Sequence, residues 1–283
     1  MTGAPLIGLH VSIAGSLDLA FDRAQEVGAT TFQIFTRNPN QWKFKPLQDE
    51  TVAAFKSKRE EAEIRRVVDH MPYLPNLASC QKPTIKISRY TLREELKRCD
   101  TLGIDYLVVH LGSHLGAGTA VGVRNVAEAC VEALAESKGE ASILLENMAG
   151  QKNSVGSRFE ELRSILDMVD DDERMGVCLD SCHAFAAGFD LSNKESVEST
   201  LGLFDELVGV RSLKVVHLND SKGGLGSRLD RHEFVGKGKI GTSGMRALVR
   251  HPNVSDKPVI METPYEDVSG MKQSMAAVRK LLR

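Results

Sequence analysis

The chain has 283 residues, and 36 lysines and arginines nearly balance 38 aspartates and glutamates, giving a formal net charge of −2 with neutral histidines. Hydrophobic residues make up 42% of the chain and charged residues 26%, which excludes a disordered, collagen-like or coiled-coil protein. The near-zero charge also excludes a histone-like polycation, so any binding to nucleic acid would depend on a local basic surface.

The cysteines and the N-terminal residues bear on the cellular compartment. An odd number of cysteines, five, does not fit a disulfide framework and favours a reducing intracellular compartment. Cys178 and Cys182 lack a second pair at metal-ligand spacing, so we expect small, part-buried residues there and no zinc site. The stretch MTGAPLIGLHVS does not resemble a secretory signal, and no run approaches the roughly 18 apolar residues of a membrane span. We expect a soluble intracellular protein without a membrane partner, in the cytoplasm or nucleoid, or in the nucleus of a eukaryote.

Short runs of apolar and β-branched residues recur along the whole chain and predict eight strands. Several of them, such as YLVVHLG and SILLENM, are continuously apolar, which is typical of parallel strands covered on both faces. In chain order, the predicted strands are Leu6–Ser12, Thr30–Thr36, Arg66–Tyr73, Tyr106–Gly112, Ser142–Met148, Met175–Ser181, Leu213–Asp220 and Pro258–Thr263.

Apolar residues at helical spacing separate these strands. One such stripe runs from Leu17 to Val27 before Gly28, another precedes Gly139, and a third, from Met271 to Leu282, closes the chain. Strand and helix alternate about eight times, which predicts an α/β fold with a single (β/α)8 TIM barrel over residues 1–283. A doubly wound open sheet is the alternative architecture.

Ionisable residues stand at the ends of most of the predicted strands. The C-terminal ends of barrel strands converge on one face, where active sites of this fold lie, so these side chains are expected to meet there. Burying so many titratable groups together is costly unless they pair or bind metal. The candidate ligands are five histidines, two glutamates and two aspartates: His70, His110, His183, His217, His232, Glu146, Glu262, Asp180 and Asp230.

The number and type of these residues predict a metal centre at the C-terminal face of the strands. A catalytic zinc takes three protein ligands, so nine are enough for three ions. Imidazole-rich sites suit Zn²⁺ better than Mg²⁺ or Ca²⁺, which prefer oxygen ligands. Of the other histidines, His10 and His114 are candidates for orienting a ligand or a water. His251, which precedes Pro252, is predicted to be structural.

Several segments are similar to one known family. The segments are GLHVSIAGSL, FQIFTRNPNQW, VVHLGSHLG, LLENMAGQ, CLDSCHAFAAGFD, HLNDSKGGLGSRLDRHEFVGKGKIG and METP, which span residues 8–264. They resemble the endonuclease IV family of apurinic/apyrimidinic (AP) endonucleases. The resemblance implies a (β/α)8 barrel with three zinc ions that incises double-stranded DNA at abasic sites.

The family's zinc ligands carry over onto matching positions of this chain. By resemblance, His70 and His110 hold one zinc, and Glu146 bridges it to a second. Asp180, His217 and Glu262 complete the second zinc, whereas His183, Asp230 and His232 hold the third.

The chemistry that the resemblance implies is metal-assisted hydrolysis of a phosphodiester. A hydroxide held at the bridging Glu146 attacks the phosphorus 5′ to the lesion, with Glu262 as a second catalytic carboxylate. The products are a 3′-hydroxyl and a 5′-deoxyribose phosphate. A 3′-phosphodiesterase activity, which trims blocked 3′ ends, is implied as well.

A basic segment with interleaved aromatics, TRNPNQWKFKP at residues 36–46, is a candidate DNA contact. Trp42 could instead seal the rim of the barrel. By resemblance, Tyr73 and Leu74 form a wedge that enters the DNA at the lesion. The full set of predicted DNA contacts is Arg37, Asn40, Gln41, Trp42, Tyr73, Leu74, Lys222, Arg228 and Arg231.

One position departs from the family pattern. Many relatives place an arginine three residues after the position of Arg37, where it enters the base stack, but this chain has Asn40 there. We expect either a lesion gap that is filled less well or compensation by Gln41 and Arg37. The departure concerns affinity for the lesion and not the metal chemistry.

The sequence also bears on three other functions: dinucleotide binding, sugar isomerisation and DNA binding without catalysis. Gly236, Gly238 and Gly241 match G-x-G-x-x-G but follow a charged loop, so no dinucleotide site is expected. A metal-dependent sugar isomerase or epimerase on a related barrel is the main alternative, and a non-catalytic DNA-binding protein is another. The pair of Asp230 and His232 and the basic aromatic segment favour the nuclease. We expect a monomer, since no extended apolar stripe is left over.

Overall fold

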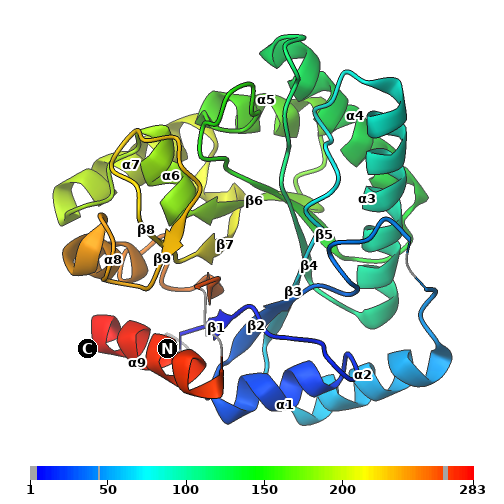
Figure 1. The fold of residues 1–283 in the computed structure, drawn as a ribbon, viewed down its shortest axis with the longest axis horizontal. Coiled ribbons are helices and arrows are strands. Elements are labelled where there is room, and N and C mark those ends of the chain that lie inside the picture. The colour runs from blue at the N-terminus through cyan, green and yellow to red at the C-terminus, as the bar shows by residue number, and fades with distance from the viewer. Residues whose placement is uncertain (1–4, 44, 264–266) are drawn as a thin grey trace.

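The computed structural model describes residues 5–43, 45–263 and 267–283. Within them, eight parallel strands form one sheet in the order β1-β10-β7-β6-β5-β4-β3-β2 (Figure 1). Their bounds are β1 Ile7–Leu9, β2 Thr31–Ile34, β3 Arg66–His70, β4 Tyr106–Val109, β5 Ser142–Glu146, β6 Met175–Asp180, β7 Leu213–His217 and β10 Val259–Met261.

The two edge strands, β1 and β2, meet and nearly close this sheet into a barrel. His10 and Gln33 form a parallel bridge just beyond β1. The backbone N–H of Thr30 also donates to the carbonyl of Ile7, at 2.9 Å. The predicted (β/α)8 barrel is therefore confirmed. The open-sheet alternative is wrong, because an open sheet would leave its edge strands apart.

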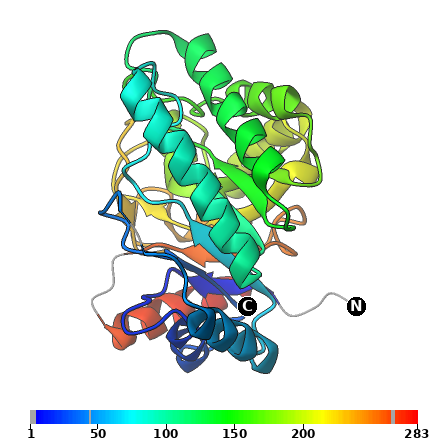
Figure 2. The same cartoon turned by 90° about the vertical axis from the view of Figure 1, so that its right-hand side faces the viewer.

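Helices surround the strands on the outside (Figures 1 and 2). They are α1 Leu19–Glu26, α2 Asp49–Glu61, α3 Lys82–Leu102, α4 Thr119–Glu136, α5 Phe159–Val169, α6 Ser181–Ala187, α7 Lys194–Leu207, α8 Gly241–Val249 and α9 Val268–Leu282, with a short 3₁₀ turn at Val210–Ser212. Gly28 follows the C-cap residue Val27 of α1 with a φ of 70°, a left-handed conformation in which glycine commonly ends a helix. Among the described residues, every helix is too short or too polar to cross a bilayer.

The strands are shorter than predicted, and the loops beyond them carry structure that the sequence did not indicate. The predicted run Leu6–Ser12, for example, pairs as a strand only over Ile7–Leu9. α6 begins directly after β6, without an intervening loop. β8 Asp220–Ser221 and β9 His232–Glu233 form a small antiparallel ribbon in the connection after β7. These elements hold polar residues at the mouth of the barrel.

A layer of apolar side chains fills the barrel interior. It takes one residue from each of six strands: Val68, Val108, Leu144, Cys178, Val215 and Ile260, all fully buried. Side chains of a strand alternate between its two faces, so the residue two positions later points into the same interior. At those positions stand His70, His110, Glu146, Asp180, His217 and Glu262. The two-residue repeat of the strands therefore places six of the nine candidate ligands in a second layer, directly above the apolar one.

Candidate metal centre

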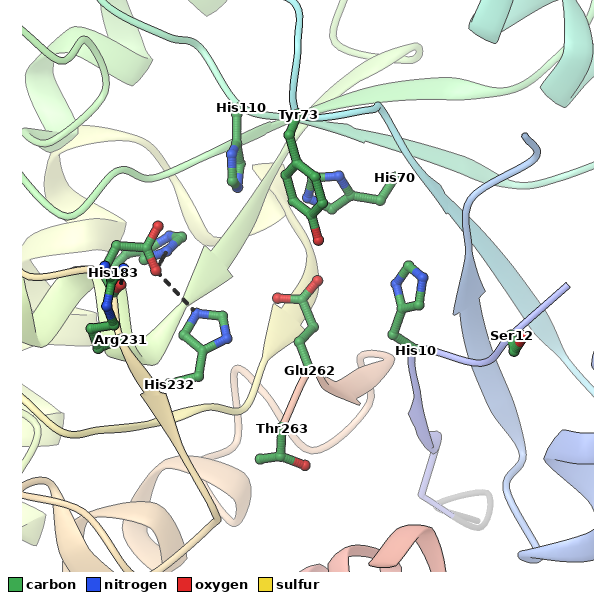
Figure 3. A pocket seen from close by; sticks show the side chains of 11 residues that line it. His10, Ser12, His70, Tyr73, His110, His183, Arg231, His232, Glu262 and Thr263 are labelled. Atoms are coloured by element: carbon green, nitrogen blue, oxygen red, sulfur yellow. Dashed lines mark hydrogen bonds and ion pairs between the residues drawn. The ribbon is translucent and has the colours of Figure 1, made fainter. Parts of the chain in front are cut away.

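A cavity of about 590 Å³ opens at the C-terminal ends of the strands. Figure 3 shows His183 and His232 on one side of this cavity, His10 on the opposite side, Glu262 near its centre, and His110 and His70 along the top of the view. Tyr73 and Arg231 line its mouth. The nine predicted ligands thus come together at one place, although they are spread over residues 70–262 of the chain.

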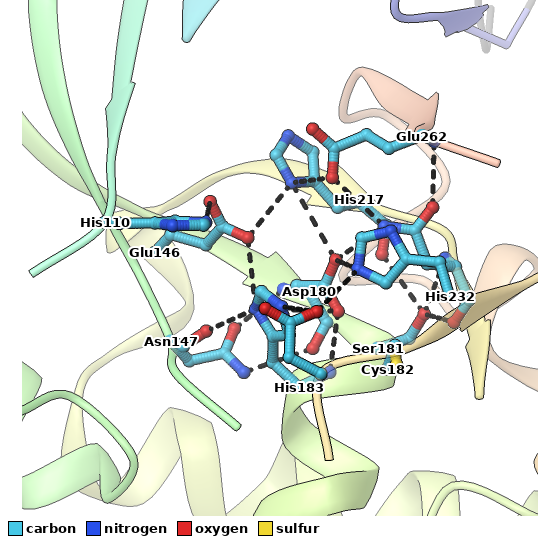
Figure 4. Close-up of polar contacts among 12 residues, drawn as sticks. His110, Glu146, Asn147, Asp180, Ser181, Cys182, His183, His217, His232 and Glu262 are labelled. Atoms are coloured by element: carbon cyan, nitrogen blue, oxygen red, sulfur yellow. Dashed lines mark hydrogen bonds and ion pairs between the residues drawn. The ribbon is translucent and has the colours of Figure 1, made fainter. Parts of the chain in front are cut away.

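Glu146, at the end of β5, is the centre of this arrangement (Figure 4). Its Oε2 lies 3.0 Å from His70 Nε2 and 3.1 Å from His110 Nε2. Its Oε1 lies 3.2 Å from His183 Nδ1 and 3.4 Å from His217 Nδ1. One fully buried carboxylate therefore faces four imidazoles, two on each oxygen. This is the geometry that a bridging ligand needs.

A second group of ligands gathers around His217. Its Nδ1 lies 3.1 Å from Glu262 Oε2 and 3.9 Å from Asp180 Oδ2. Asp180 ends β6 and also caps α6, because its Oδ1 accepts the backbone N–H of His183 at 2.7 Å. This cap turns the chain sharply at the strand end and directs His183 back over the site.

The third group combines α6 with the ribbon beyond β7. His183 Nε2 lies 3.2 Å from Asp230 Oδ1, and His232 Nε2 lies 3.6 Å from the same oxygen. Asp230 and His232, two residues apart in the connection after β7, both face His183. The side chains of Asp230 and His232 remain 32% and 19% exposed, in contrast to the fully buried Glu146.

In the part of the chain that the structure describes, four sets of His, Cys, Asp and Glu side chains bring their ligand atoms within 4.8 Å of one another. Three of them are the sets that the resemblance implies: His70, His110 and Glu146 (the first set); Glu146, Asp180, His217 and Glu262 (the second set); and His183, Asp230 and His232 (the third set). The fourth, Asp180, Cys182 and His232, was not anticipated. Cys182 was expected to be a small part-buried residue, and it is buried as a free thiol beside the site.

The hydrogen bonds of the imidazoles test whether these sets suit a metal. His70 Nδ1 donates to the Met71 carbonyl at 2.8 Å, and His183 Nδ1 donates to the Asn147 carbonyl at 3.0 Å. A carbonyl only accepts, so Nδ1 carries a proton in both rings, and Nε2 is the nitrogen that would offer its lone pair to a metal. Of the buried side-chain atoms in the described residues, His183 Nε2 and His232 Nε2 are among the few without a hydrogen-bond partner. Buried imidazole nitrogens that face carboxylates without a hydrogen-bond partner fit a site in which a divalent cation lies between them.

Electrostatics keep the carboxylates of the site charged, and the same contacts raise the pKa of His183 and of His217 well above its usual range, so a bound cation would displace protons from these rings. Burial would raise the pKa of Glu146, but His110 and His217 outweigh it and hold the pKa well below its usual range. The same opposition holds the pKa of Glu262 well below its ordinary value, mainly through His217. Desolvation lowers the pKa of His10 to about 4, which leaves that ring neutral. Both carboxylates are thus available as anionic ligands at neutral pH.

Polar side chains that the sequence analysis missed hold the ligands in place. Gln33 Oε1 accepts from His217 Nε2 at 2.8 Å, so that Nδ1 is the nitrogen facing the second set. The Nε2 of Gln33 donates to Glu262 at 2.6 Å and to His10 at 3.1 Å. Asn219 donates to Asp180 at 2.6 Å. Gln33 lies in β2 and Asn219 just after β7, so their place at strand ends was the signal that could have found them.

Replacing Gln33 by leucine should weaken metal binding while leaving the fold intact. The change removes the acceptor that fixes the tautomer of His217 and a donor to Glu262, and losses of this kind cost about tenfold or more in metal affinity. A chelator competition with Zn²⁺ measures the affinity. Gln25→Leu, on the exposed surface of α1, is the matched control. Equal affinities of the two variants would contradict this role of Gln33.

Comparison with known proteins decides the family. The family model described as xylose isomerase-like TIM barrel matches residues 21–281. A protein of Methanoculleus marisnigri named probable endonuclease 4 is 49% identical over 278 residues, which cover 98% of each chain. The chain belongs to the endonuclease 4 family. The resemblance to endonuclease IV seen in the sequence is therefore confirmed.

Solved structures agree with this assignment. The crystal structure of endonuclease IV from Thermus thermophilus superposes with a TM-score of 0.88 at 35% identity, covering 98% of this chain and 99% of that one. A D-tagatose 3-epimerase-like protein superposes with a TM-score of 0.72 at 19% identity, over 98% and 96% of the two chains. The second likeness concerns the fold alone. The barrel itself therefore does not separate the endonuclease 4 family from sugar-active proteins.

Among the predicted DNA contacts of this endonuclease 4 family member, Tyr73 and Arg231 line the cavity, and all but one of the set are exposed. The side chains of Tyr73, Leu74 and Trp42 are 61%, 38% and 36% exposed. The other exposed members of the set are Asn40, Gln41, Lys222, Arg228 and Arg231. Arg37 is the exception, because it is buried and its guanidinium bonds to Glu95 and to the Gln41 carbonyl. Arg37 is therefore engaged within the protein and is not part of the exposed surface that the other predicted contacts form.

Other motifs have their own explanations. The amides of Gly238, Ile240 and Gly241 all donate to the carboxylate of Asp220, so this glycine motif binds a protein side chain. His114 Nδ1 accepts the amides of Gly116 and Gly118, which makes it part of its own loop and not a partner of the ligands. His251 contacts Glu198 and the amide of Asn253, consistent with a structural role.

Proposed function

We propose that the chain is a zinc-dependent AP endonuclease that hydrolyses the phosphodiester 5′ to an abasic site in double-stranded DNA. The products would be a 3′-hydroxyl and a 5′-deoxyribose phosphate, and blocked 3′ ends would be trimmed by the same centre. The observation that carries the proposal is the shared carboxylate of Glu146, whose two oxygens serve two adjacent ligand sets. We further propose that residues 1–283 act as one domain and as an intracellular monomer.

The three sets would hold three zinc ions. Zinc there would supply an activated water near neutral pH and neutralise charge on the phosphoryl oxygens. The protein's own part is to present anionic carboxylates, and imidazoles that give up a proton to the cation from a fixed nitrogen. Asp180 is fixed by Asn219, and Glu262 by Gln33. Such preorganisation avoids the cost of rearranging the site during the reaction.

The surroundings of the cavity suit a damaged duplex. Tyr73 and Leu74 are large apolar side chains that project next to the ligand His70, where a wedge into the base stack would be needed. The exposed cations Lys222, Arg228 and Arg231 come from the same connection after β7 that supplies Asp230 and His232, and they would contact phosphates. A sugar isomerase has no evident use for an exposed wedge or for this basic rim.

A duplex with one tetrahydrofuran abasic analogue tests the proposal. The analogue cannot undergo β-elimination, so a lyase cannot nick it. We expect zinc-loaded protein to cut immediately 5′ to the analogue and to leave a 3′-hydroxyl that a polymerase extends. An uncut duplex, incubated with folded protein that holds three zinc ions per chain, would overturn the proposal. Sugar isomerisation with one or two other divalent ions would then become the function to test.

Restoring an arginine at position 40 should tighten binding to the lesion. Asn40 is exposed in the segment next to Trp42, and a longer cationic side chain could fill the gap and approach a phosphate. We expect Asn40→Arg to lower the Kd for the abasic duplex by about fivefold, without a change in zinc content. Gln273→Arg on α9 adds the same charge elsewhere and serves as the control. An equal gain in both variants would show a non-specific charge effect.

A further inference from the structure

A cluster of buried polar residues lies beside the segment that follows β2, apart from the nine ligands. We call it the anchoring cluster and define it as Thr36, Arg37, Asp69, Glu95 and Arg98. All five are less than 9% exposed, and Asp69 and Glu95 are completely buried. Two cations thus face two acids inside the protein. Buried charges of this kind are costly unless every group is paired.

Glu95, on α3, uses both oxygens to hold the start of the segment. Its Oε1 accepts from Arg37 Nε, and its Oε2 accepts from the hydroxyl of Thr36 at 2.9 Å. Arg37 then extends to the carbonyl of Gln41 through Nη1. The backbone of the exposed stretch at residues 38–43, the recognition segment, is therefore connected to Glu95 through one arginine.

Arg98, one turn later on α3, holds both sides of the same segment. Its Nη2 donates to the carbonyl of Thr36 at 2.6 Å, and its Nε donates to the hydroxyl of Thr36 at 3.0 Å. Its Nη1 donates to the carbonyl of Lys45 at 3.2 Å. α3 thus fixes the chain before and after the recognition segment, which runs beside this helix in Figure 1.

Asp69 joins the cluster to the metal centre. Its Oδ1 accepts the backbone N–H of Thr36 at 3.0 Å, and its Oδ2 accepts from Cys99 Sγ at 3.4 Å. The next residue is His70, a member of the first set. One hydrogen-bonded cluster therefore fixes the recognition segment relative to the strand end that presents His70.

We propose that Glu95 is a positioning residue for lesion recognition. Resting on the proposed function, the inference is that Glu95 orders the recognition segment in the free protein, with Asn40, Gln41 and Trp42 exposed at its tip. A segment ordered in advance loses less conformational entropy when it binds, so the affinity for damaged DNA rises. An apolar replacement of the cluster could be equally stable, but it would not direct the backbone at Thr36, Gln41 and Lys45.

Trp42 reports on this segment alone, because it is the chain's one tryptophan. Glu95→Gln keeps the shape of the side chain but leaves Arg37 and Arg98 without their shared anion. We expect Trp42 in the free variant to show lower fluorescence anisotropy and stronger quenching by acrylamide than in the wild type. The Kd for the tetrahydrofuran duplex should rise about tenfold. The nicking rate at saturating DNA and the zinc content should stay within twofold of wild type.

Asp105→Asn is the matched control. Asp105 pairs with Arg59 and Arg66 and accepts the backbone N–H of Val67, at the opposite end of β3. This variant should lose stability without any change in Trp42 or in the Kd. A purely structural role of Glu95 predicts the same pattern for Glu95→Gln, and that result would overturn the inference.

A second variant with a smaller change tests the inference in case Glu95→Gln does not fold. Thr36→Val removes the hydroxyl that links Glu95 to Arg98 and should move Trp42 anisotropy and the Kd in the same direction, by smaller amounts. If Glu95→Gln does not fold, unchanged values in Thr36→Val would overturn the inference. Failure of the proposed function can be distinguished from failure of this inference. If the proposed function is wrong, the wild-type protein leaves the duplex uncut. The Trp42 measurement is made without DNA and tests the role of Glu95 independently.

Discussion

Glu146→Gln should abolish nicking of the abasic duplex, with a fall of at least about a thousandfold in the single-turnover rate, or about 4 kcal/mol in the barrier. The carboxylate lies within 3.0 to 3.4 Å of four imidazole nitrogens. An amide has the same shape but carries no charge, and its NH₂ group would face two rings that should offer lone pairs to a cation. We expect the zinc content to fall as well, because the first and second sets both lose their shared anion.

The same variant should still bind DNA. Tyr73, Leu74 and the exposed cations at the rim do not contact Glu146, so the Kd for the tetrahydrofuran duplex should stay within about threefold of wild type. Glu161→Gln is the matched control, because Glu161 accepts a backbone N–H from Gly156 away from the ligands. A Glu146→Gln protein that nicks at the wild-type rate would contradict the bridging role. A wild type that binds but never nicks would indicate a binding protein instead.

The strand period explains why so much of this centre could be predicted. Six ligands stand two residues after the inner apolar layer, so the alternation of a strand and the convergence of a barrel place them together. The residue pattern marks His183 as a candidate close to Asp180, but its orientation depends on the cap that Asp180 forms on α6, which the pattern does not reveal. Asp230 and His232 depend on the ribbon of β8 and β9, which two residues per strand do not reveal in a sequence.

Contacts between residues far apart in the sequence explain why Arg37, predicted as a DNA contact, is buried in the structure. Arg37 stands in a basic segment, and local composition alone favours a phosphate contact. Its partner Glu95 is 58 residues away on α3, and no local pattern connects the two. Gln33 was missed for a related reason, because a glutamine in an apolar run carries no charge to mark it. Its position near a strand end was the one available signal, and its contact with His217, 184 residues later, shows its role.

The three metal positions should not be equally tight, and the third should empty first. Its ligands Asp230 and His232 come from one short stretch beyond β7 and remain 32% and 19% exposed, so water and chelator can reach them. The second set is built on strand ends, with His217 and Asp180 fully buried. Replacing His232 by alanine should therefore reduce the zinc content from about three ions per chain to about two, with the other sets intact.

Chelator titration of the wild-type protein should release the zinc ions in the same order, without a mutation. One zinc should leave at low chelator concentration with loss of nicking, and the remaining ions should leave later with a fall in Tm of about 10 °C, because buried ligands then lose their shared cations. Adding Zn²⁺ should restore both properties. His251→Ala, which removes a histidine bonded only to Glu198 and to Asn253 in the described residues, controls for loss of an imidazole. Simultaneous release of all ions, with a single transition in activity and Tm, would show that the three sets bind as one unit and would contradict a weaker third position.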